Sequence, residues 1–378
     1  MTLKVLTVTT LFPNVAQPRH GIFIANRLHQ LQQYCDVDIE VVAPIAWFPG
    51  SHLLPSYQHL KEIPATTRWK SLTVHHPRFL SAPGRAFGFK PHFIAQAYAK
   101  AASNQYDIID AHYAYPDGAA TALLANKLNL PYVLSVRGSD INVLPDQHPD
   151  NKKKIKTALG EASAVIGVSR PLTENVKQLQ PAVKKVVTLE NGVDNQLFRL
   201  QQPELTEDKL LLSVGNLIDL KGHHLIVEAM PELTDYRLVI IGSGSKQHEL
   251  EQRIQELGLE SRVTIVNNIA QEALVEWYNR AKFTLLCSSH EGCPNVVLES
   301  MASGTPVLAT RVGACEDLID ENVTGLFVEQ RSAEGIADAV RRAEQQGFNK
   351  GQVHQIAQKF DWESVCKKQF ELYQSVVQ

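Results

Sequence analysis

The chain is poor in cysteine, and this scarcity excludes the common cysteine-based sites. Its 378 residues include five cysteines, an odd number at scattered positions with no C-x-x-C pair. This spacing indicates neither a zinc site nor a disulfide framework. Reduced thiols are typical of cytoplasmic proteins, and we expect the chain to work in that compartment.

Long hydrophobic runs are also missing. No apolar stretch approaches the ~18 residues of a membrane-spanning helix. The N-terminal residues lead into a short apolar stretch that ends near Pro13, without the longer apolar core and small-residue cleavage site of a signal peptide. We therefore expect a protein that is soluble, or peripheral on the inner face of the cell membrane.

A strong charge of one sign is absent as well. The net charge is −3, which gives no overall signal for nucleic acid, and we expect no nucleic acid partner. The charge is unevenly distributed, however. Residues 1–195 contain 20 Lys and Arg against 14 Asp and Glu, whereas residues 196–378 contain 17 against 26. This asymmetry indicates that the two halves face different partners.

The sequence does contain a regular alternation of short β-branched runs and longer helical patterns. Its length suits two domains of roughly 150–200 residues. Near-continuous apolar strands that alternate with helices predict buried parallel sheets and an α/β fold. The pattern restarts after the polar stretch 195–208, which is the best linker candidate. The expected strands are 4–9, 38–42, 108–110, 132–136, 164–168, 186–189, 210–214, 237–241, 263–266, 283–287, 306–309 and 325–328.

One segment, residues 43–91, breaks this alternation, because it is rich in Pro, aromatic residues and His and shows few helical periods. From Lys61 to Lys100 there are seven Lys and Arg and a single acid, Glu62. Basic residues interleaved with exposed aromatics suit an anionic membrane surface. A solvated loop with a few core aromatics explains the pattern equally well. The interleaved residues are Arg68, Trp69, Lys70, Arg78, Phe79, Arg85, Phe87, Phe89 and Lys90.

The most specific motif runs from Glu291 to Glu299, with the sequence EGCPNVVLE. An expected strand ends just before it in a polar turn, and a helix begins near Asn295. Open α/β sheets bind ligands at the carboxyl ends of their strands, and a helix start offers unpaired N–H groups to a phosphate. The two carboxylates can accept hydrogen bonds from sugar hydroxyls. A lone pair of Glu would most simply be solvated acids; the full string is far more specific.

This string resembles the E-x7-E motif of the GT-B glycosyltransferases of family 4. In that family the second Glu holds the ribose hydroxyls, and the first Glu holds the donor sugar near its reacting carbon. Backbone amides between them bind the diphosphate. The resemblance therefore implies these roles for Glu299, for Glu291, and for the amides of Asn295, Val296 and Val297.

Two further stretches resemble donor-binding parts of the same family. Residues 214–222 resemble a strand and loop that supply an Arg and a Lys to the donor diphosphate. Lys221 matches the Lys, whereas Asn216 stands at the Arg position. A neutral amide makes a weaker phosphate contact than a charged group does. Gly242 and Gly244 follow a strand and allow close backbone approach to the nucleotide, although such a pair alone is usually just a turn.

The first half resembles the acceptor-side lobe of these enzymes. Gly21 lies in a stretch that resembles the glycine loop after the first strand, which approaches donor phosphate and acceptor. His112 matches the family's strand-end His and is expected to face the donor sugar across the cleft. Most of the 14 His have no such role, and a satisfied core His is the alternative.

The strand ends that follow His112 add three acceptor-side or cleft residues. Arg137 and Asp140 belong to an R-G-S-D string that resembles the family's H-G-x-D pattern. In this form, followed by INVLP, it is most like enzymes that build teichuronic-acid-type or other bacterial cell-surface polysaccharides. Ser169 ends a further strand at a site that often faces the cleft.

The resemblance spans essentially the whole chain and implies a GT-B fold, with two Rossmann-like lobes facing a central cleft. Similar enzymes pass the last helix back to the first lobe. The expected domains are residues 1–195 with 360–378 on the acceptor side and residues 196–359 for the nucleotide-sugar, with the boundary near 193–202.

The family's chemistry is a retaining transfer from a nucleotide-sugar, here a UDP- or GDP-sugar, to a saccharide or lipid-linked saccharide. No D-x-D motif stands out, so we expect neither a metal nor another cofactor. Lys221 and helix-terminus amides would then neutralise the leaving diphosphate. Glu291 and His112 would position the sugar, and the departing phosphate oxygen would take the acceptor proton.

Two other functions are compatible with parts of the sequence. A sugar-nucleotide 2-epimerase shares the two-lobe fold, but its characteristic strings are missing. A catalytically weak, donor-binding subunit of a glycosyltransferase complex is compatible with Asn216. The presence of Glu291, Glu299, Lys221 and His112 together argues against it. Release of nucleotide diphosphate from a panel of nucleotide-sugars separates these functions.

Overall fold

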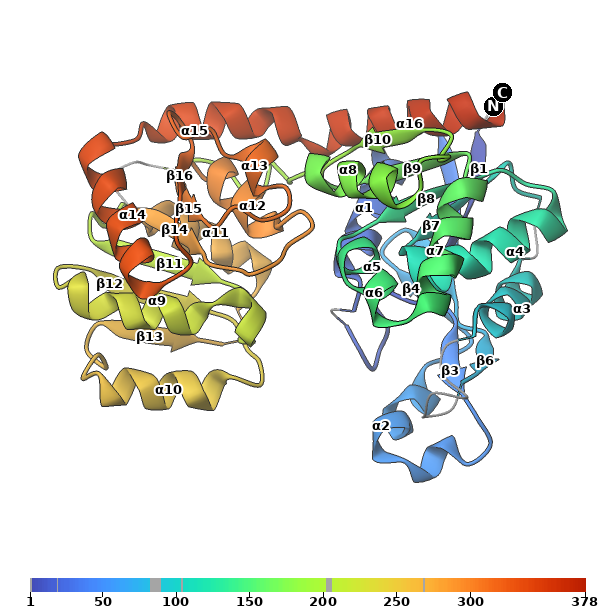
Figure 1. The fold of residues 1–378 in the computed structure, drawn as a ribbon, viewed down its shortest axis with the longest axis horizontal. Helices are drawn as coiled ribbons and strands as arrows, with labels where there is room; N and C mark the ends of the chain where they lie inside the picture. Colours follow the sequence, from blue (N-terminus) through green and yellow to red (C-terminus); the bar gives the residue numbers. More distant parts are fainter. Residues whose placement is uncertain (1, 19, 82–89, 103–104, 202–205, 268) are drawn as a thin grey trace. The chain divides into compact units, whose positions relative to one another are not determined.

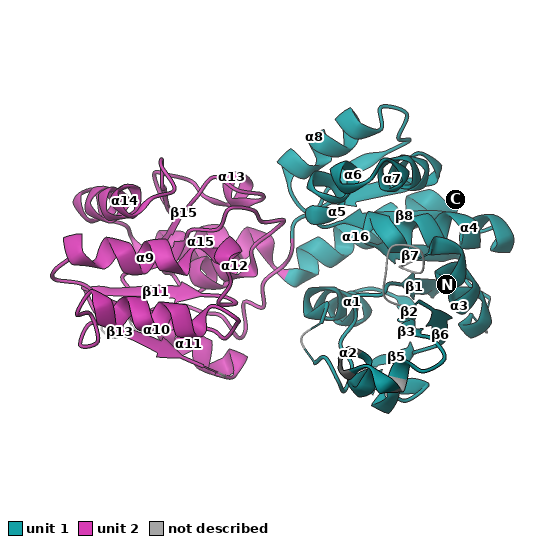
Figure 2. Cartoon of the chain, turned by 60° about the horizontal axis from the view of Figure 1, so that its bottom comes forward, with its two compact units in different colours: residues 1–190, 362–378 teal, residues 191–361 magenta. Residues whose placement is uncertain are grey.

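The computed structural model describes residues 2–18, 20–81, 90–102, 105–201, 206–267 and 269–378. The chain folds into two compact units, which Figure 2 shows in different colours. One consists of Met1–Glu190 with Trp362–Gln378, and the other of Asn191–Asp361. No helix within the described ranges is long and apolar enough to span a membrane.

The first unit is built on an eight-stranded sheet in the order β10-β9-β8-β7-β1-β2-β5-β4, parallel except for the antiparallel β4–β5 pair. Its central strands are buried on both faces, because helices cover both sides (Figure 1). The strands are β1 (Leu3–Val8), β2 (Val37–Val42), β4 (Thr66–Trp69), β5 (Leu72–His75), β7 (Ile108–His112), β8 (Tyr132–Val136), β9 (Ala164–Gly167) and β10 (Val186–Thr188). The helices are α1 (Ile22–Tyr34), α2 (Pro55–Gln58), α3 (Pro91–Ala101), α4 (Ala119–Leu128), α5 (Ser139–Asn142), α6 (Leu144–Gln147), α7 (Pro149–Glu161), α8 (Arg170–Leu179) and α16 (Trp362–Val377).

The second unit holds a six-stranded parallel sheet in the order β13-β12-β11-β14-β15-β16. Its strands are β11 (Leu210–Val214), β12 (Arg237–Ile241), β13 (Val263–Val266), β14 (Phe283–Leu286), β15 (Val307–Ala309) and β16 (Gly325–Phe327). Its helices are α9 (His223–Ala229), α10 (Gln247–Glu256), α11 (Gln271–Arg280), α12 (Asn295–Ala302), α13 (Cys315–Leu318), α14 (Ala333–Gln346) and α15 (Lys350–Ala357). All twelve strands expected from the sequence are present in the two sheets, and the prediction of two α/β, Rossmann-like lobes is confirmed.

The segment 43–81 is more ordered than its sequence pattern indicated. The hairpin β4–β5 extends the large sheet, with Leu72 and Val74 in the core and Thr73 exposed between them. A separate pair of parallel strands, β3 (Ile45–Trp47) and β6 (Arg78–Leu80), stands apart from it. Of the interleaved residues, Arg85, Phe87 and Phe89 lie outside the described residues.

The last helix, α16, belongs to the first unit, although residues 191–361 of the other unit precede it. It packs against α1 and adds buried apolar side chains to the core of the first unit, among them Trp362, Val365 and Tyr373. Each such buried side chain contributes ~1.5–3 kcal/mol, which in sum holds the helix to this unit.

The division between the units differs from the expected one by a few residues. It lies after Glu190 and after Asp361, rather than at 195 and 359. The physical reason is that the crossing segments pack with the second unit. The Asn191 side-chain amide donates to Asn295 Oδ1 at 2.8 Å, and Val193 forms a β-bridge with Asp361.

Candidate donor and acceptor sites

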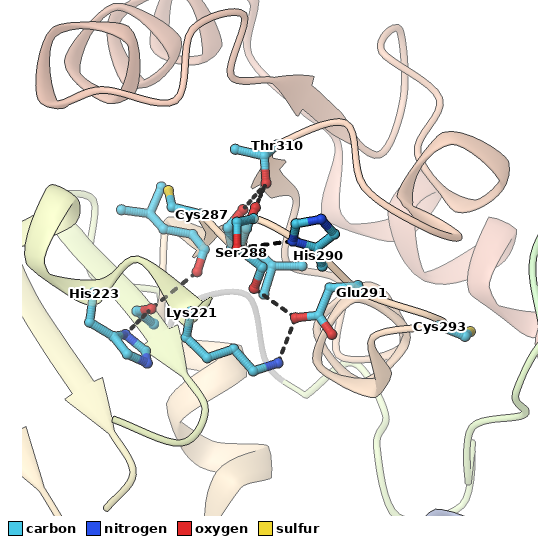
Figure 3. A network of polar contacts seen from close by, with 12 residues as sticks. Lys221, His223, Cys287, Ser288, His290, Glu291, Cys293 and Thr310 are labelled. Carbon is cyan, nitrogen blue, oxygen red and sulfur yellow. Dashed lines mark hydrogen bonds and ion pairs between the residues drawn. The ribbon is translucent and has the colours of Figure 1, made fainter. Parts of the chain in front are cut away.

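Lys221 and Glu291 meet at the carboxyl edge of the second sheet (Figure 3). Lys221 ends a short 3-10 turn after β11, and Glu291 lies between β14 and α12. The Lys221 Nζ lies 2.5 Å from Glu291 Oε1, and Ser288 Oγ donates to the same oxygen at 2.6 Å. The two charged side chains are only 19% and 12% exposed. Without ligand, the carboxylate is therefore held by a cation and a hydroxyl.

Backbone bonds lock the loops that carry this pair. The Ser289 N–H donates to the Leu220 carbonyl at 2.8 Å, which ties the turn after β14 to the turn after β11. Thr310, which follows β15, donates its hydroxyl to the Ser288 carbonyl at 2.6 Å. The edge is thus rigid before any ligand arrives, as electrostatic preorganisation requires.

Glu299 lies on α12 in a half-buried position. The Tyr278 hydroxyl donates to Glu299 Oε2 at 3.0 Å. Burial raises the pKa of the Glu299 carboxyl to about 7, although hydrogen bonds from Tyr278 and Gln271 act in the opposite direction. Both partners belong to α11, more than twenty residues earlier in the chain. Nothing in the local sequence around Glu299 indicates them, and sequence reasoning missed them.

The start of α12 offers fewer amides than the sequence motif implies. Val297 N–H already donates to the Pro294 carbonyl at 3.1 Å. The first N–H groups of a helix have no partner inside it, so those of Asn295 and Val296 stay the candidates for a phosphate. The side chain of Asn295 is used differently, as the acceptor that holds Asn191.

The remaining donor-side residues follow β11 and β12. Asn216 is exposed in the loop after β11. A Cβ at Gly242 would lie 1.8 Å from the Gly215 carbonyl oxygen, and one at Gly244 would lie 2.3 Å from that of Leu217. These two glycines therefore let one loop of the protein pack against another. This packing explains why glycine stands at both positions, independently of the nucleotide approach expected from the sequence.

In the first unit, His112 is fully buried at the end of β7. Its Nε2 lies 2.9 Å from Asp110 Oδ2, and its Nδ1 lies 2.9 Å from an Arg137 Nη2. Burial, the largest cause, lowers the pKa of His112; Asp110 raises it, and Arg137 and Arg27 lower it further. A neutral imidazole follows. Both ring nitrogens are thus engaged within the protein, and the expected role of His112 at the donor sugar stays a prediction.

Arg137 is only half-buried, and its guanidinium lies 5.2 Å from the centre of the Phe23 ring. Asp140 is fully buried and accepts the backbone N–H groups of Ala114, Arg137 and Gly138 at 2.8–2.9 Å. It therefore joins the turns after β7 and β8.

The two other sequence candidates of this unit also have clear structural contacts. The Ser169 hydroxyl caps α8 by accepting the Leu172 N–H at 3.4 Å. Gly21 precedes α1 with a φ of 66°, and a Cβ there would lie 2.2 Å from the Leu11 carbonyl oxygen. Both are placed by packing within the first unit.

Two family models match the chain in sequence. Residues 54–197 match the model described as Glycosyltransferase Family 4, and residues 194–359 match Glycosyl transferases group 1. The chain is 29% identical to the "Putative teichuronic acid biosynthesis glycosyltransferase TuaC" of Bacillus subtilis, over 99% of each chain. The chain belongs to family 4 of the GT-B glycosyltransferases. The expected family is thereby confirmed.

Solved structures agree with the family in fold. Sucrose-phosphate synthase from Thermosynechococcus elongatus matches with a TM-score of 0.79 at 19% identity, over 99% of each chain. HepE of Anabaena, solved with UDP and glucose, matches with a TM-score of 0.71 at 18% identity, over 99% of this chain and 100% of that one. At these identities the likeness shows the GT-B fold alone.

As a family member the chain is a glycosyltransferase, which favours this activity over the epimerase considered above. The sequence candidates fall into two groups. The second unit brings Lys221 and Glu291 into contact, with Glu299 on the helix that follows. The first unit brings His112, Arg137 and Asp110 into contact. Across the described residues, no group of three or more His, Cys, Asp or Glu is arranged to hold a metal ion.

Proposed function

We propose that this glycosyltransferase moves a sugar, with retention of configuration, from a UDP- or GDP-sugar to a saccharide or lipid-linked saccharide. The product would be part of a bacterial cell-surface polysaccharide. The Bacillus subtilis relative, whose name places it in teichuronic acid biosynthesis, supports the pathway class. HepE, solved with UDP and glucose, supports a nucleotide-sugar donor.

The observation that carries the proposal is the Lys221–Glu291 pair beside the start of α12. A diphosphate has more negative charge than a carboxylate, so it can draw the Lys221 ammonium away from Glu291. The released carboxylate is then free to accept hydrogen bonds from the donor sugar. The Asn295 and Val296 amides and the positive end of the α12 dipole add to the phosphate site.

In the proposed reaction no metal takes part. The bond from the anomeric carbon to the diphosphate oxygen breaks, and a bond from that carbon to an acceptor oxygen forms on the same face. The departing diphosphate oxygen takes the acceptor proton. Lys221 stabilises the charge that develops on the diphosphate, and Glu291 stabilises positive charge near the anomeric carbon.

His112 is proposed to act at the donor sugar from the first unit. Its Nε2–H is held by Asp110, so Nδ1 is the nitrogen available for a ligand. In the ligand-free protein Arg137 donates to that nitrogen, and it must turn aside for His112 to meet a sugar. Because burial keeps the imidazole neutral, Nδ1 would accept a sugar hydroxyl rather than donate to it.

A panel of UDP-, GDP- and ADP-sugars, with chromatography of the released nucleotide diphosphate, tests the donor. One UDP- or GDP-sugar should be consumed by the wild type and not by Lys221→Met. Lys209→Met is the matched control, because Lys209 pairs with Glu344 on the exterior of the same unit. No consumption of any donor, despite tight binding of UDP or GDP, would favour the donor-binding subunit instead.

If the acceptor is lipid-linked, the first unit works at an anionic bilayer, and we propose that other side chains than the aromatics expected from the sequence contact it. Trp69 packs edge-to-face on Phe12 and His29, and Phe79 is buried, so neither is an exposed anchor. Among the described residues of this segment, the large apolar side chains that are exposed are Trp47, Leu80, Leu53 and Leu54, at 46%, 40%, 73% and 38%.

Two features make these side chains suitable for a bilayer. Trp47 and Leu80 are direct neighbours across the β3–β6 pair. Lys61 and Arg78 line a cavity of about 330 Å³ together with Trp47. Cations beside exposed Trp and Leu side chains suit the boundary between headgroups and acyl chains. Each cation near an anionic surface contributes about 1 kcal/mol, an attraction that salt weakens.

Co-sedimentation with vesicles tests this docking. The wild type should pellet with phosphatidylcholine–phosphatidylglycerol vesicles at low salt and stay in solution with phosphatidylcholine alone. A Trp47→Ser/Leu53→Ser variant should lose binding while keeping UDP affinity. Leu123→Ser removes a Leu of the same unit that is 50% exposed on α4, and it should bind as the wild type does. Equal binding by both variants would refute the assigned surface.

A further inference from the structure

A continuous chain of buried polar side chains connects the last helix to His112. Arg27 of α1 donates from Nε to Gln369 Oε1 at 2.6 Å, and the Gln369 amide nitrogen lies 2.5 Å from the Tyr373 hydroxyl. The Tyr373 hydroxyl lies beside the Asp110 carboxyl, whose Oδ2 is 2.9 Å from His112 Nε2. All five side chains are fully buried.

The direction of every hydrogen bond in this chain is fixed by its two ends. A guanidinium only donates, so Arg27 requires the Gln369 oxygen to face it, and the Gln369 NH₂ then donates to Tyr373. The Tyr373 proton is thereby left for Asp110. At the other end Arg137 donates to His112 Nδ1, which requires the proton of His112 on Nε2. Both halves converge on the Asp110 carboxyl, which accepts the Nε2–H of His112 on one side and faces the Tyr373 hydroxyl on the other.

We propose that Gln369 and Tyr373 of α16 are positioning residues of the transferase site, which hold the Asp110 carboxylate and through it the Nε2–H tautomer and orientation of His112. This inference rests on the proposed role of His112 in the transfer. The site of the first unit would then depend on α16, a helix that follows the whole second unit in the chain.

Arg27 also contacts the segment through which the chain leaves the first unit. Its Nη1 donates to the Leu189 and Glu190 carbonyls at 3.4 and 3.3 Å, at the point where the chain leaves the first unit. One buried guanidinium therefore holds both the outgoing segment and the returning helix. Removing one partner of a buried charged network is costly, so Arg27 should hold both segments firmly in place.

Tyr373→Phe and Gln369→Glu test the proposal in different ways. Tyr373→Phe keeps the ring but removes one donor from Asp110. Gln369→Glu keeps an acceptor for Arg27, so it should not lower the melting temperature. Its carboxylate competes with Asp110 for the Tyr373 proton. In both variants Asp110 loses the contact with the Tyr373 hydroxyl and interacts more strongly with His112, so the pKa of His112 should rise. The other charged groups around His112, Arg27 and Arg137, are unchanged.

The readouts are ¹⁵N-histidine NMR of the full chain, with His112 assigned from His112→Gln, and turnover of the donor found in the panel. In both variants the His112 titration should move to higher pH, and kcat should fall by about 10- to 100-fold. The Kd of UDP, which measures the second unit alone, should not change. Tyr132→Phe is the control, because its hydroxyl donates to the Ala158 carbonyl in the same core. It should change neither readout.

The outcomes separate this inference from the proposed function. A His112 titration and tautomer that stay as in the wild type in both variants would overturn the link through α16. Equal loss of turnover in Tyr132→Phe would also overturn it, because the effect would then be one of stability. Full turnover in His112→Gln would instead refute the proposed role of His112, and the NMR spectra alone would then decide whether Gln369 and Tyr373 hold its imidazole.

Discussion

The affinity for nucleotide should depend on pH through one carboxyl, that of Glu299. Burial raises the pKa of this group to about 7, from an ordinary value of 4.5. A carboxyl that holds two ribose hydroxyls must be ionised to accept both hydrogen bonds. In the free protein it is protonated below about pH 7, so a nucleotide that requires the ionised form binds more weakly as the pH falls. Each pH unit below the pKa costs about tenfold.

The magnitude follows directly from this value. Binding of UDP or GDP should be about 30-fold weaker at pH 5.5 than at pH 8, and binding at pH 5.5 should release a proton. Calorimetry in buffers of different ionisation enthalpy measures both quantities. Glu299→Gln imitates the protonated carboxyl and should retain only the titration of the nucleotide phosphate, near pH 6. The same pH dependence in the wild type and in Glu299→Gln would refute the reasoning.

Further predictions concern the paired acids, the metal and the buried Asp140. Glu299→Ala should weaken UDP or GDP binding by about 1.5–3 kcal/mol, measured by calorimetry, whereas Glu291→Ala should lower turnover more than nucleotide affinity. Equal losses of affinity with unchanged turnover would contradict these roles. Activity should persist in excess chelator, and a strict requirement for Mn²⁺ or Mg²⁺ would refute a metal-free transfer. Asp140→Ala leaves three buried N–H groups unpaired and should destabilise the first unit by about 3 kcal/mol or more in chemical unfolding, while UDP affinity stays unchanged.

Much of the fold could be predicted because buried parallel strands have a strong local pattern. Strands such as β8 and β12 consist almost entirely of apolar residues, so their ends coincide with the expected ones. The strands of the segment 43–81 were harder to predict from the sequence. In β5 only two core residues, Leu72 and Val74, alternate with polar ones, which is too short a run for a period of two to stand out.

The division between the units lies a few residues before the expected domain boundary at 195. A polar, non-periodic stretch is typical of a linker, and residues 195–208 have that composition. The chain changes units slightly earlier, after Glu190. What decides the boundary is a tertiary contact, the hydrogen bond from Asn191 to Asn295, whose partners are about a hundred residues apart.

The residues of the candidate site also differ in whether a local sequence pattern indicates them. Glu291, Glu299 and Lys221 could be found from the sequence, because a string of neighbouring residues carries them. Their partners could not. Tyr278 is distant in sequence from Glu299, and Tyr373 is distant from Asp110; no local pattern indicates either contact. The sequence left open whether the aromatic residues near Lys70 are exposed or in the core, since only tertiary packing shows that Trp69 lies against Phe12.

The two units hold their charged groups in opposite ways, and the difference bears on how each could act. In the second unit Lys221 and Glu291 neutralise each other at a partly exposed edge, so an arriving diphosphate can replace one partner of the pair. In the first unit the donors and acceptors from Arg27 to Asp110 are fully buried, with bond directions fixed by a guanidinium. The second unit is therefore suited to exchange its contacts on binding a donor, whereas the buried groups of the first must be in place beforehand. A substitution in the exchangeable pair should thus alter affinity or turnover without loss of stability, whereas one in the buried chain should act through the geometry of His112.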